Sequence, residues 1–180
     1  DEKTLNALIE RLKGVDQVIF VGGISPRLEG EELPISVDGF RGGDRTTIAL
    51  PEVQTELMKK MKEAGLPVIF VMMTGSALGI EWESQNIPAI LNAWYGGQFA
   101  GQAIADVLFG DYNPSGKLPV TFYRSDSDLP PFGAFSMANR TYRYFKGEAL
   151  YPFGFGLSYT MFDYSVPQVV SGGKVGEPIK

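Results

Sequence analysis

The side chains best suited to chemistry are three glutamates that lie within one short acidic segment, Glu29, Glu31 and Glu32. A carboxylic acid in a partly dry loop can keep its proton near neutral pH, because desolvation or a neighbouring charge raises its pKa. Such an acid can protonate a departing oxygen, which is what cleavage of a glycosidic bond requires. The alternative is a solvated acidic turn, since runs of charge in loops usually face water. The residues themselves leave both interpretations open.

Composition excludes several other kinds of site. The chain has no Cys and no His, which excludes thiolate catalysis, Ser-His-Asp chemistry, an imidazole base and the usual zinc sites. We therefore expect no metal and no cofactor, and carboxylates must carry any acid–base step. A net charge of −5 disfavours nucleic acid and anionic membranes as partners. The longest apolar run, 68–73, is far shorter than the roughly 18 residues of a membrane helix, so we expect no membrane span.

Helical and strand patterns alternate over residues 5–109. Apolar residues at helical spacing predict helices that end at Gly14, that run from Pro51 to Gly65, and that cover residues 98–109. Short runs rich in β-branched residues predict buried strands at 17–21, 67–73 and 87–94. This alternation predicts a mostly parallel sheet flanked by helices on both faces, an α/β sandwich. Ligands are then expected beyond the strands' carboxyl ends, in the loops that follow Val21, Met73 and Trp94.

Two of these helices have an apolar face that we expect to be buried. In the helix of residues 51–65 the face consists of Val53, Leu57 and Met61. In the helix of residues 98–109 it consists of Ala100, Ala103, Ile104, Val107 and Leu108.

The acidic residues belong to a long loop, residues 22–47, whose length indicates a functional or mobile segment. Asp44 and Arg45 follow a Gly-Gly pair in this loop. We expect them to form a buried ion pair that holds the loop against the sheet, or to cap the helix that begins at Pro51. A role in loop positioning or substrate binding is favoured over direct catalysis.

Glycines and aromatic residues allow further alternatives. A strand–helix junction carries the glycine motif Gly96-Gly97-x-x-x-Gly101, which could cradle a phosphate. The motif lacks the G-x-G-x-x-G spacing of nucleotide-binding loops, so we favour close packing of helix on strand and expect no nucleotide. Trp94, Tyr95 and the aromatic residues of positions 122–162 could stack on sugar rings or fill the core.

From residue 110 the chain is rich in Pro, Gly and aromatic residues, and we expect it to wrap around the domain.

Five segments carry a resemblance to a known family: GISPRLEGEE, GFRGGDRTTIALPEVQ, PVIFVMMTGSALGIEW, ILNAWYGGQFAGQAIADVLFGDYNPSGKLPVTF and TYRYFKGEALYPFGFGLSYTMFDY. In order and in content they resemble the C-terminal region of glycoside hydrolase family 3. The resemblance covers nearly the whole chain, and the GGQ-to-GKLP block and the YPFGFGLSY block are its most specific parts.

The resemblance implies a retaining, two-step exo-β-glycosidase, a β-D-xylosidase or β-D-glucosidase that acts on terminal β-linked sugars of oligosaccharides. In that family an N-terminal (β/α)8 barrel carries the nucleophilic Asp, and the α/β sandwich domain lends a Glu as acid/base. The family's Gly-Glu step matches Gly30-Glu31, so Glu31 is the implied acid/base, with Glu29 second and Glu32 third. The barrel is not in this sequence, so the chain alone is expected to be inactive.

The resemblance also implies a domain division. Residues 1–160 would form a partial α/β sandwich domain, and residues 161–180 a linker and the first strand of a fibronectin type III-like domain, where residues 162–166 alternate like a strand. Residues 1–14 contain no Met and no leader pattern, which indicates a processed or missing N-terminus. Polysaccharide substrates favour a secreted or periplasmic location. The alternative function is a non-catalytic α/β module that binds carbohydrate or another domain.

Overall fold

A parallel three-stranded sheet forms the centre of the molecule. A computed structural model describes residues 2–30, 32–170, 172–176 and 178. Strands β1 (Val18–Gly23), β5 (Val68–Met73) and β6 (Ala89–Asn92) lie in the order β1-β5-β6, and both pairings are parallel. Each expected strand is therefore present, and the α/β class is confirmed. Because the strands are parallel, their carboxyl ends meet at one edge of the sheet.

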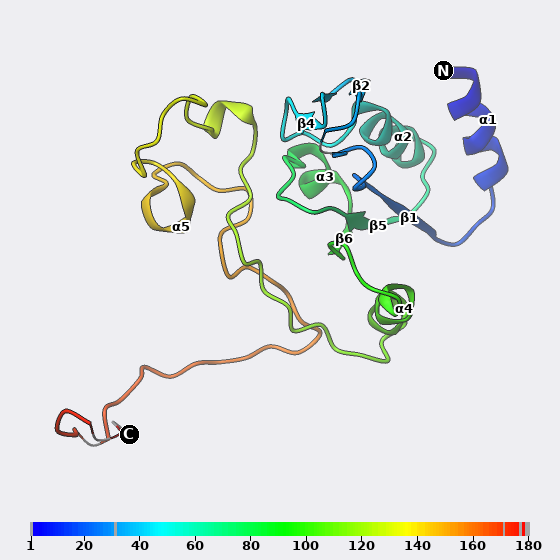
Figure 1. Ribbon diagram of the computed structural model, residues 1–180. Helices are drawn as coiled ribbons and strands as arrows, with labels where there is room; N and C mark the ends of the chain where they lie inside the picture. The colour runs from blue at the N-terminus through cyan, green and yellow to red at the C-terminus, as the bar shows by residue number, and fades with distance from the viewer. Residues whose placement is uncertain (1, 31, 171, 177, 179–180) are drawn as a thin grey trace.

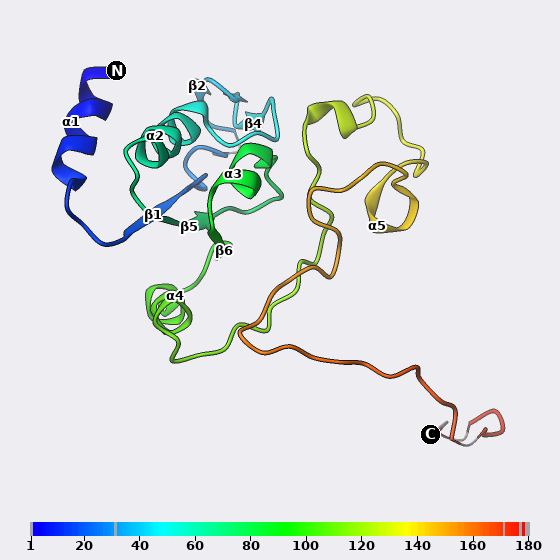
Figure 2. The same cartoon turned by 180° about the vertical axis from the view of Figure 1, so that it is seen from behind.

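Helices lie on both sides of this sheet (Figures 1 and 2). Helices α2 (Glu52–Glu63) and α3 (Glu81–Asn86) lie on one side and α4 (Ala100–Phe109) on the other, while α1 (Glu2–Leu12) flanks α2. Local sequence sets the helix ends. Pro51 precedes α2 with a φ of −51°, and Gly110 ends α4 in the left-handed region with a φ of 85°.

The core lies between the sheet and the α2–α3 layer. It contains the fully buried side chains of Met58, Phe70 and Met72, together with Leu78 and Ile80 from the segment that follows β5. In α2 the buried residues are Met58 and Met61, whereas Val53 is 62% exposed, so the expected face is correct only in its second half. The inward side of the first turn is instead Gln54, which bonds to Gly23 and lines up with Met58 and Met61 at helical spacing, so Val53 lies beside the buried stripe.

The expected buried face of α4 is wrong, because α4 contains no buried residue. On the same side of the sheet, Ile19 and Val21 of β1 are 42% and 60% exposed. An amphipathic pattern predicts which face of a helix is apolar, but burial also needs an opposing surface. Here α4 stands away from the sheet (Figure 1), and its residues line an apolar hollow together with Leu91 and Ala93.

The long loop between β1 and α2 contains structure that the sequence pattern did not predict. Three short antiparallel strands form a second sheet in it: β2 (Ser36–Val37), β3 (Phe40–Arg41) and β4 (Asp44–Arg45). Phe40 is 6% exposed and belongs to the core cluster. The loop is thus pinned to the domain by an aromatic anchor, which counts against a freely mobile segment.

The tail doubles back on itself rather than wrapping closely around the domain. Phe122 pairs with Tyr151, and Leu118 exchanges backbone hydrogen bonds with residues 154–155, so two distant stretches run side by side. Phe122 is 1% exposed and closes one end of the core. Beyond this ribbon the chain forms a separate lobe with a 3-10 helix η1 (Asp126–Asp128) and helix α5 (Thr141–Tyr144) (Figure 1).

Residues 162–170 extend away from the domain (Figure 2). Residues 162–166 form no strand, so the alternating pattern there is not a strand in this structure. In the described part of the chain, every helix is too short or too polar to cross a membrane.

Candidate functional site

The site begins at Gly23, where the chain leaves β1. Gly23 has a φ of +116°, and a Cβ there would lie 2.0 Å from the carbonyl oxygen of Met73, so only glycine fits. Gln54 of α2 holds this residue from the other side, since its amide donates to the Gly23 carbonyl and accepts from the Gly23 N–H, both at 2.7 Å. The start of the acidic loop is therefore fixed against both the sheet and α2.

Glu29 lies at the carboxyl edge of the sheet, where the topology places a ligand site. Its Oε2 accepts a hydrogen bond of 2.7 Å from the hydroxyl of Tyr95, which follows β6. This contact joins the loops of the two outer strands across the end of the central strand. Gly75, which follows β5, makes room for it, because a Cβ on Gly75 would lie 2.7 Å from Tyr95 Cε2 and 3.3 Å from Glu29 Oε2.

A second contact holds the other oxygen of Glu29. Ser76 Oγ donates to Glu29 Oε1 at 3.5 Å, and Arg45 Nη1 donates to Ser76 Oγ at 2.8 Å and to the Ala77 carbonyl at 3.2 Å. The buried Thr74 fixes the turn that presents Ser76, with its hydroxyl donating to the Ser76 carbonyl at 2.6 Å. We call Glu29, Tyr95, Ser76 and Arg45 the carboxylate network.

Burial sets the charge states around Glu29. Burial, and then the hydrogen bond to Glu29, raises the pKa of Tyr95 far above its ordinary value, so the phenol stays protonated and can donate. Burial lowers the pKa of Arg45, while Glu29 and Asp126 act in the opposite direction. Arginine remains a cation at neutral pH. Arg45 Nη2 is buried and has no partner among the described residues, which leaves one donor for a further acceptor.

The other predicted site residues are placed as follows. Glu31 lies outside the described residues. Glu32 is exposed and has a φ of 63°. Asp44 is also exposed, and the described residues contain no ion pair between Asp44 and Arg45, so the expected buried pair is wrong. Capping of α2 by Asp44 is wrong as well, because the cap residue is Pro51 and no side chain bonds there.

Arg45 holds the loop to the segment after β5, and the tail holds the residues that follow. Asp126 of η1 accepts a hydrogen bond of 2.6 Å from Thr47 Oγ1 and one of 2.8 Å from the Ile48 N–H. The carboxylate network is thus tied to the sheet on one side and to the tail on the other.

Sequence reasoning missed Ser76 and gave Tyr95 only a general role as an aromatic residue. A signal for Tyr95 exists, since it directly follows a strand at the sheet edge where ligands are expected. Trp94, just before it, has a φ of +53°, which is rare for a bulky residue and is typical of functional sites. The Trp94 ring packs edge-on against Phe122 at 6.1 Å, which stabilises this conformation.

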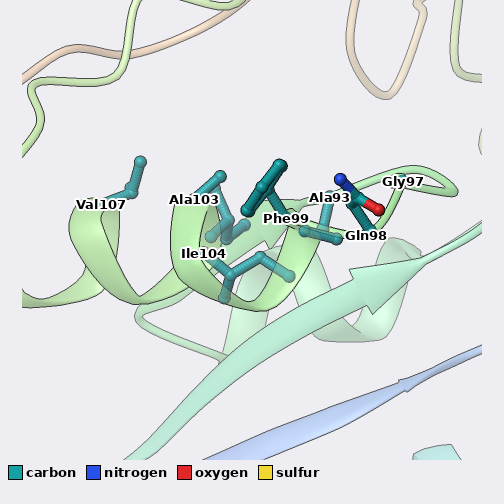
Figure 3. Close-up of a pocket in the computed structure, with 10 residues that line it drawn as sticks. Ala93, Gly97, Gln98, Phe99, Ala103, Ile104 and Val107 are labelled. Atoms are coloured by element: carbon teal, nitrogen blue, oxygen red, sulfur yellow. The ribbon is translucent and has the colours of Figure 1, made fainter.

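An apolar hollow lies elsewhere, between the end of β6 and α4 (Figure 3). It has a volume of about 570 Å³, and its lining includes Phe99, Ala103, Ile104 and Val107 but no charged side chain. The hollow therefore lacks acid–base chemistry.

Gly97 and Gly101 face open space, so close helix–strand packing does not explain these two glycines. Gly96 does need to be small, because a Cβ on Gly96 would lie 2.4 Å from the Cβ of Ala100. The described residues contain no cluster of acidic side chains that could hold a metal.

Comparison with known proteins gives a consistent assignment. Residues 2–159 match the model of the glycosyl hydrolase family 3 C-terminal domain. A xylan 1,4-beta-xylosidase of Xylanibacter ruminicola is 56% identical over 161 residues, which cover 89% of this chain and 19% of that protein. A periplasmic beta-glucosidase of Salmonella typhimurium is 38% identical over 173 residues, which cover 89% of this chain and 21% of that protein.

Solved structures show the same relationship. A beta-glucosidase from Kluyveromyces marxianus matches with a TM-score of 0.78 and 28% identity, over 96% of this chain and 21% of that one. An exo-beta-xylosidase in complex with a xylobiose aziridine probe matches with a TM-score of 0.71 and 28% identity, over 89% of this chain and 21% of that one. The chain thus spans about a fifth of the length of these relatives.

Proposed function

The chain belongs to glycosyl hydrolase family 3, as its C-terminal domain, and on this basis we propose that it is part of a retaining exo-β-glycosidase. The whole protein would remove terminal β-linked sugars from oligosaccharides. A β-D-xylosidase is the first choice, because the relative with 56% identity is named a xylosidase and the β-glucosidase of Salmonella typhimurium is 38% identical.

The observation that carries the proposal is the position of the acidic loop. Glu29 lies at the carboxyl edge of the sheet and is fixed there by Tyr95. That edge is where α/β folds bind ligands. Glu31, which lies outside the described residues, belongs to the same acidic loop two positions further along the chain.

We assign the acid/base role to Glu31 rather than to Glu29. Both oxygens of Glu29 accept hydrogen bonds from within the domain, from Tyr95 and Ser76, which is the behaviour of a structural carboxylate. A general acid must instead offer a proton to a sugar oxygen. Glu31 would first protonate the departing glycosidic oxygen and later remove a proton from the water that attacks the intermediate.

The covalent partner in this scheme lies outside the chain. An Asp of a (β/α)8 barrel in the same protein would attack the anomeric carbon and form the glycosyl-enzyme intermediate. In retaining enzymes the two carboxyl groups stand about 5 Å apart, so the barrel must pack close to the acidic loop. The exposed face of Ile19 and Val21 and the apolar hollow beside α4 are surfaces that the remainder of the protein would cover.

The test uses the full-length protein with Glu31→Ala, Glu29→Ala or Glu32→Ala, assayed on aryl β-xylosides and β-glucosides with and without azide. We expect the Glu31 variant alone to lose turnover and to regain it as glycosyl azide forms, because azide needs no general base. Glu63→Ala, at the exposed end of α2, is the matched control.

Other outcomes have distinct meanings. Rescue of the Glu29 variant by azide would move the acid/base role to Glu29. Full turnover in all three variants would show that the acidic loop is a solvated turn, and the domain would then be a non-catalytic module.

A further inference from the structure

We propose that Tyr95 is a positioning residue for the acidic loop: its hydroxyl anchors Glu29 at the sheet edge, and the general-acid step of the proposed function depends on this anchor. This inference rests on the proposed function and adds a residue to it. Tyr95 would touch neither sugar nor reacting atoms, and would act only through the loop.

The contact spans a large sequence distance. Tyr95 and Glu29 lie 66 residues apart and come from the loops of the two outer strands, β6 and β1. A single side-chain hydrogen bond of 2.7 Å therefore decides where one loop lies relative to the other. Its acceptor is a carboxylate, which makes it stronger than a bond between neutral groups.

The backbone around Tyr95 is built for this contact. Trp94 adopts a φ of +53°, a conformation that costs energy for a large side chain and persists only where the surroundings impose it. Gly75 leaves the space through which the Tyr95 ring reaches Glu29. Tyr95 itself is 37% exposed, so the ring contributes modestly to the core, and the hydroxyl is its most specific feature.

Hydrogen-bonded turns carry the position of Glu29 along the loop. The Glu29 N–H donates to the Ser25 carbonyl at 3.0 Å, which closes the turn before the carboxylate. After it, the Leu33 N–H donates to the Gly30 carbonyl at 3.0 Å. Gly30 is buried, and a Cβ there would lie 2.5 Å from Leu33 Cδ1. Backbone hydrogen bonds thus hold Glu29, Gly30 and Leu33 of the acidic loop, and a shift of Glu29 would be passed along these described residues.

The charge states support the same role. Because burial and Glu29 keep the Tyr95 phenol protonated over the whole working range of pH, the anchor does not titrate during catalysis. Ser76, which follows β5 and accepts a hydrogen bond from Arg45, donates to the second oxygen of Glu29. Loss of the Tyr95 hydroxyl would leave Glu29 held on that side alone.

The experiment compares two leaving groups in the full-length protein carrying Tyr95→Phe. Substrates are a 2,4-dinitrophenyl glycoside, which leaves without protonation, and the matching disaccharide, which needs it. We expect kcat/KM to fall by roughly 10- to 100-fold for the disaccharide, as for a misplaced catalytic group, and by less than about 3-fold for the aryl glycoside. Azide should accelerate turnover of the aryl glycoside by the variant.

The readout is a ratio of two rate constants from one preparation, so it is independent of the fraction of folded enzyme. Tyr164→Phe, at a side chain that is 90% exposed, should keep the wild-type ratio. If Glu31→Gln changes the ratio and Tyr95→Phe does not, the positioning role is wrong and the proposed function stands. If Glu31→Gln also leaves the ratio unchanged, the proposed function itself fails.

Discussion

Replacing Gly75 by alanine should disrupt the contact between Tyr95 and Glu29. The new Cβ would lie 2.7 Å from Tyr95 Cε2, whereas carbon atoms in contact normally stand about 3.5–4.0 Å apart, so the ring must move by roughly 1 Å. A shift of that size takes the hydroxyl, now 2.7 Å from Glu29, out of good hydrogen-bonding range.

The cost can be bounded from the structure. Tyr95 is 37% exposed, so the ring can move toward solvent, and the steric part should lie near the lower end of overpacking costs, about 1 kcal/mol. A hydrogen bond to a charged group contributes about 1.5–3 kcal/mol, part of which water restores at this exposed position. We therefore expect Gly75→Ala to lower the free energy of unfolding by about 2 kcal/mol.

A double-mutant cycle in urea tests this reasoning on the full-length protein. In a Tyr95→Ala background the clash partner is absent, so Gly75→Ala should cost much less, giving a coupling energy above about 1 kcal/mol. Gly97→Ala is the control, because a Cβ at that position meets no atom within 4 Å. Equal costs of Gly75→Ala in both backgrounds would refute the contact, and a costless substitution in the wild type would refute the geometry.

Two further predictions concern the core and the pH dependence of stability. Phe122→Ala should lower the free energy of unfolding by about 3–5 kcal/mol, because it removes a ring that is only 1% exposed. Phe132→Ala, at a fully exposed ring, should change the free energy of unfolding little. Urea unfolding midpoints measure both effects. Burial and Glu29 raise the pKa of Tyr95 above its unfolded value of 10.0, so the folded state keeps a proton that the unfolded state loses above that pH. The contribution of protonated Tyr95 to the free energy of unfolding is intact below pH 10 and declines as the pH rises further. Unfolding midpoints between pH 9 and pH 11 should therefore fall more steeply in the wild type than in Tyr95→Phe. Parallel curves for the two proteins would contradict this.

The parts of the fold that depend on local pattern could be predicted from the sequence. The three strands and the helices over residues 2–12, 52–63 and 100–109 follow from hydrophobic period and from Gly and Pro punctuation, although burial on both faces does not, since β6 contains no buried residue. The location of the acidic loop at the carboxyl edge follows from the alternation of strands and helices. Glu29 therefore lies where the sequence places it.

Features that depend on an opposing surface could not be predicted in this way. The apolar pattern of α4 is real, but none of its residues is buried. Asp44 and Arg45 are neighbours in sequence, yet in the β4 strand successive side chains point to opposite faces. Only Arg45 turns inward, so the local charge pair that the sequence suggests does not form.

The carboxylate network shows why sequence proximity is a poor guide to this site. Its members come from four separate segments, and the order β1-β5-β6 brings them together at one edge. The tail extends the same chain of contacts, since Phe122 supports the strained Trp94 and Asp126 holds the residues after Arg45. The position of the acidic loop thus depends on residues up to about position 126. A substitution far from Glu29 in sequence, in the tail, should therefore alter catalysis through the loop as well as stability, and the leaving-group ratio separates the two effects.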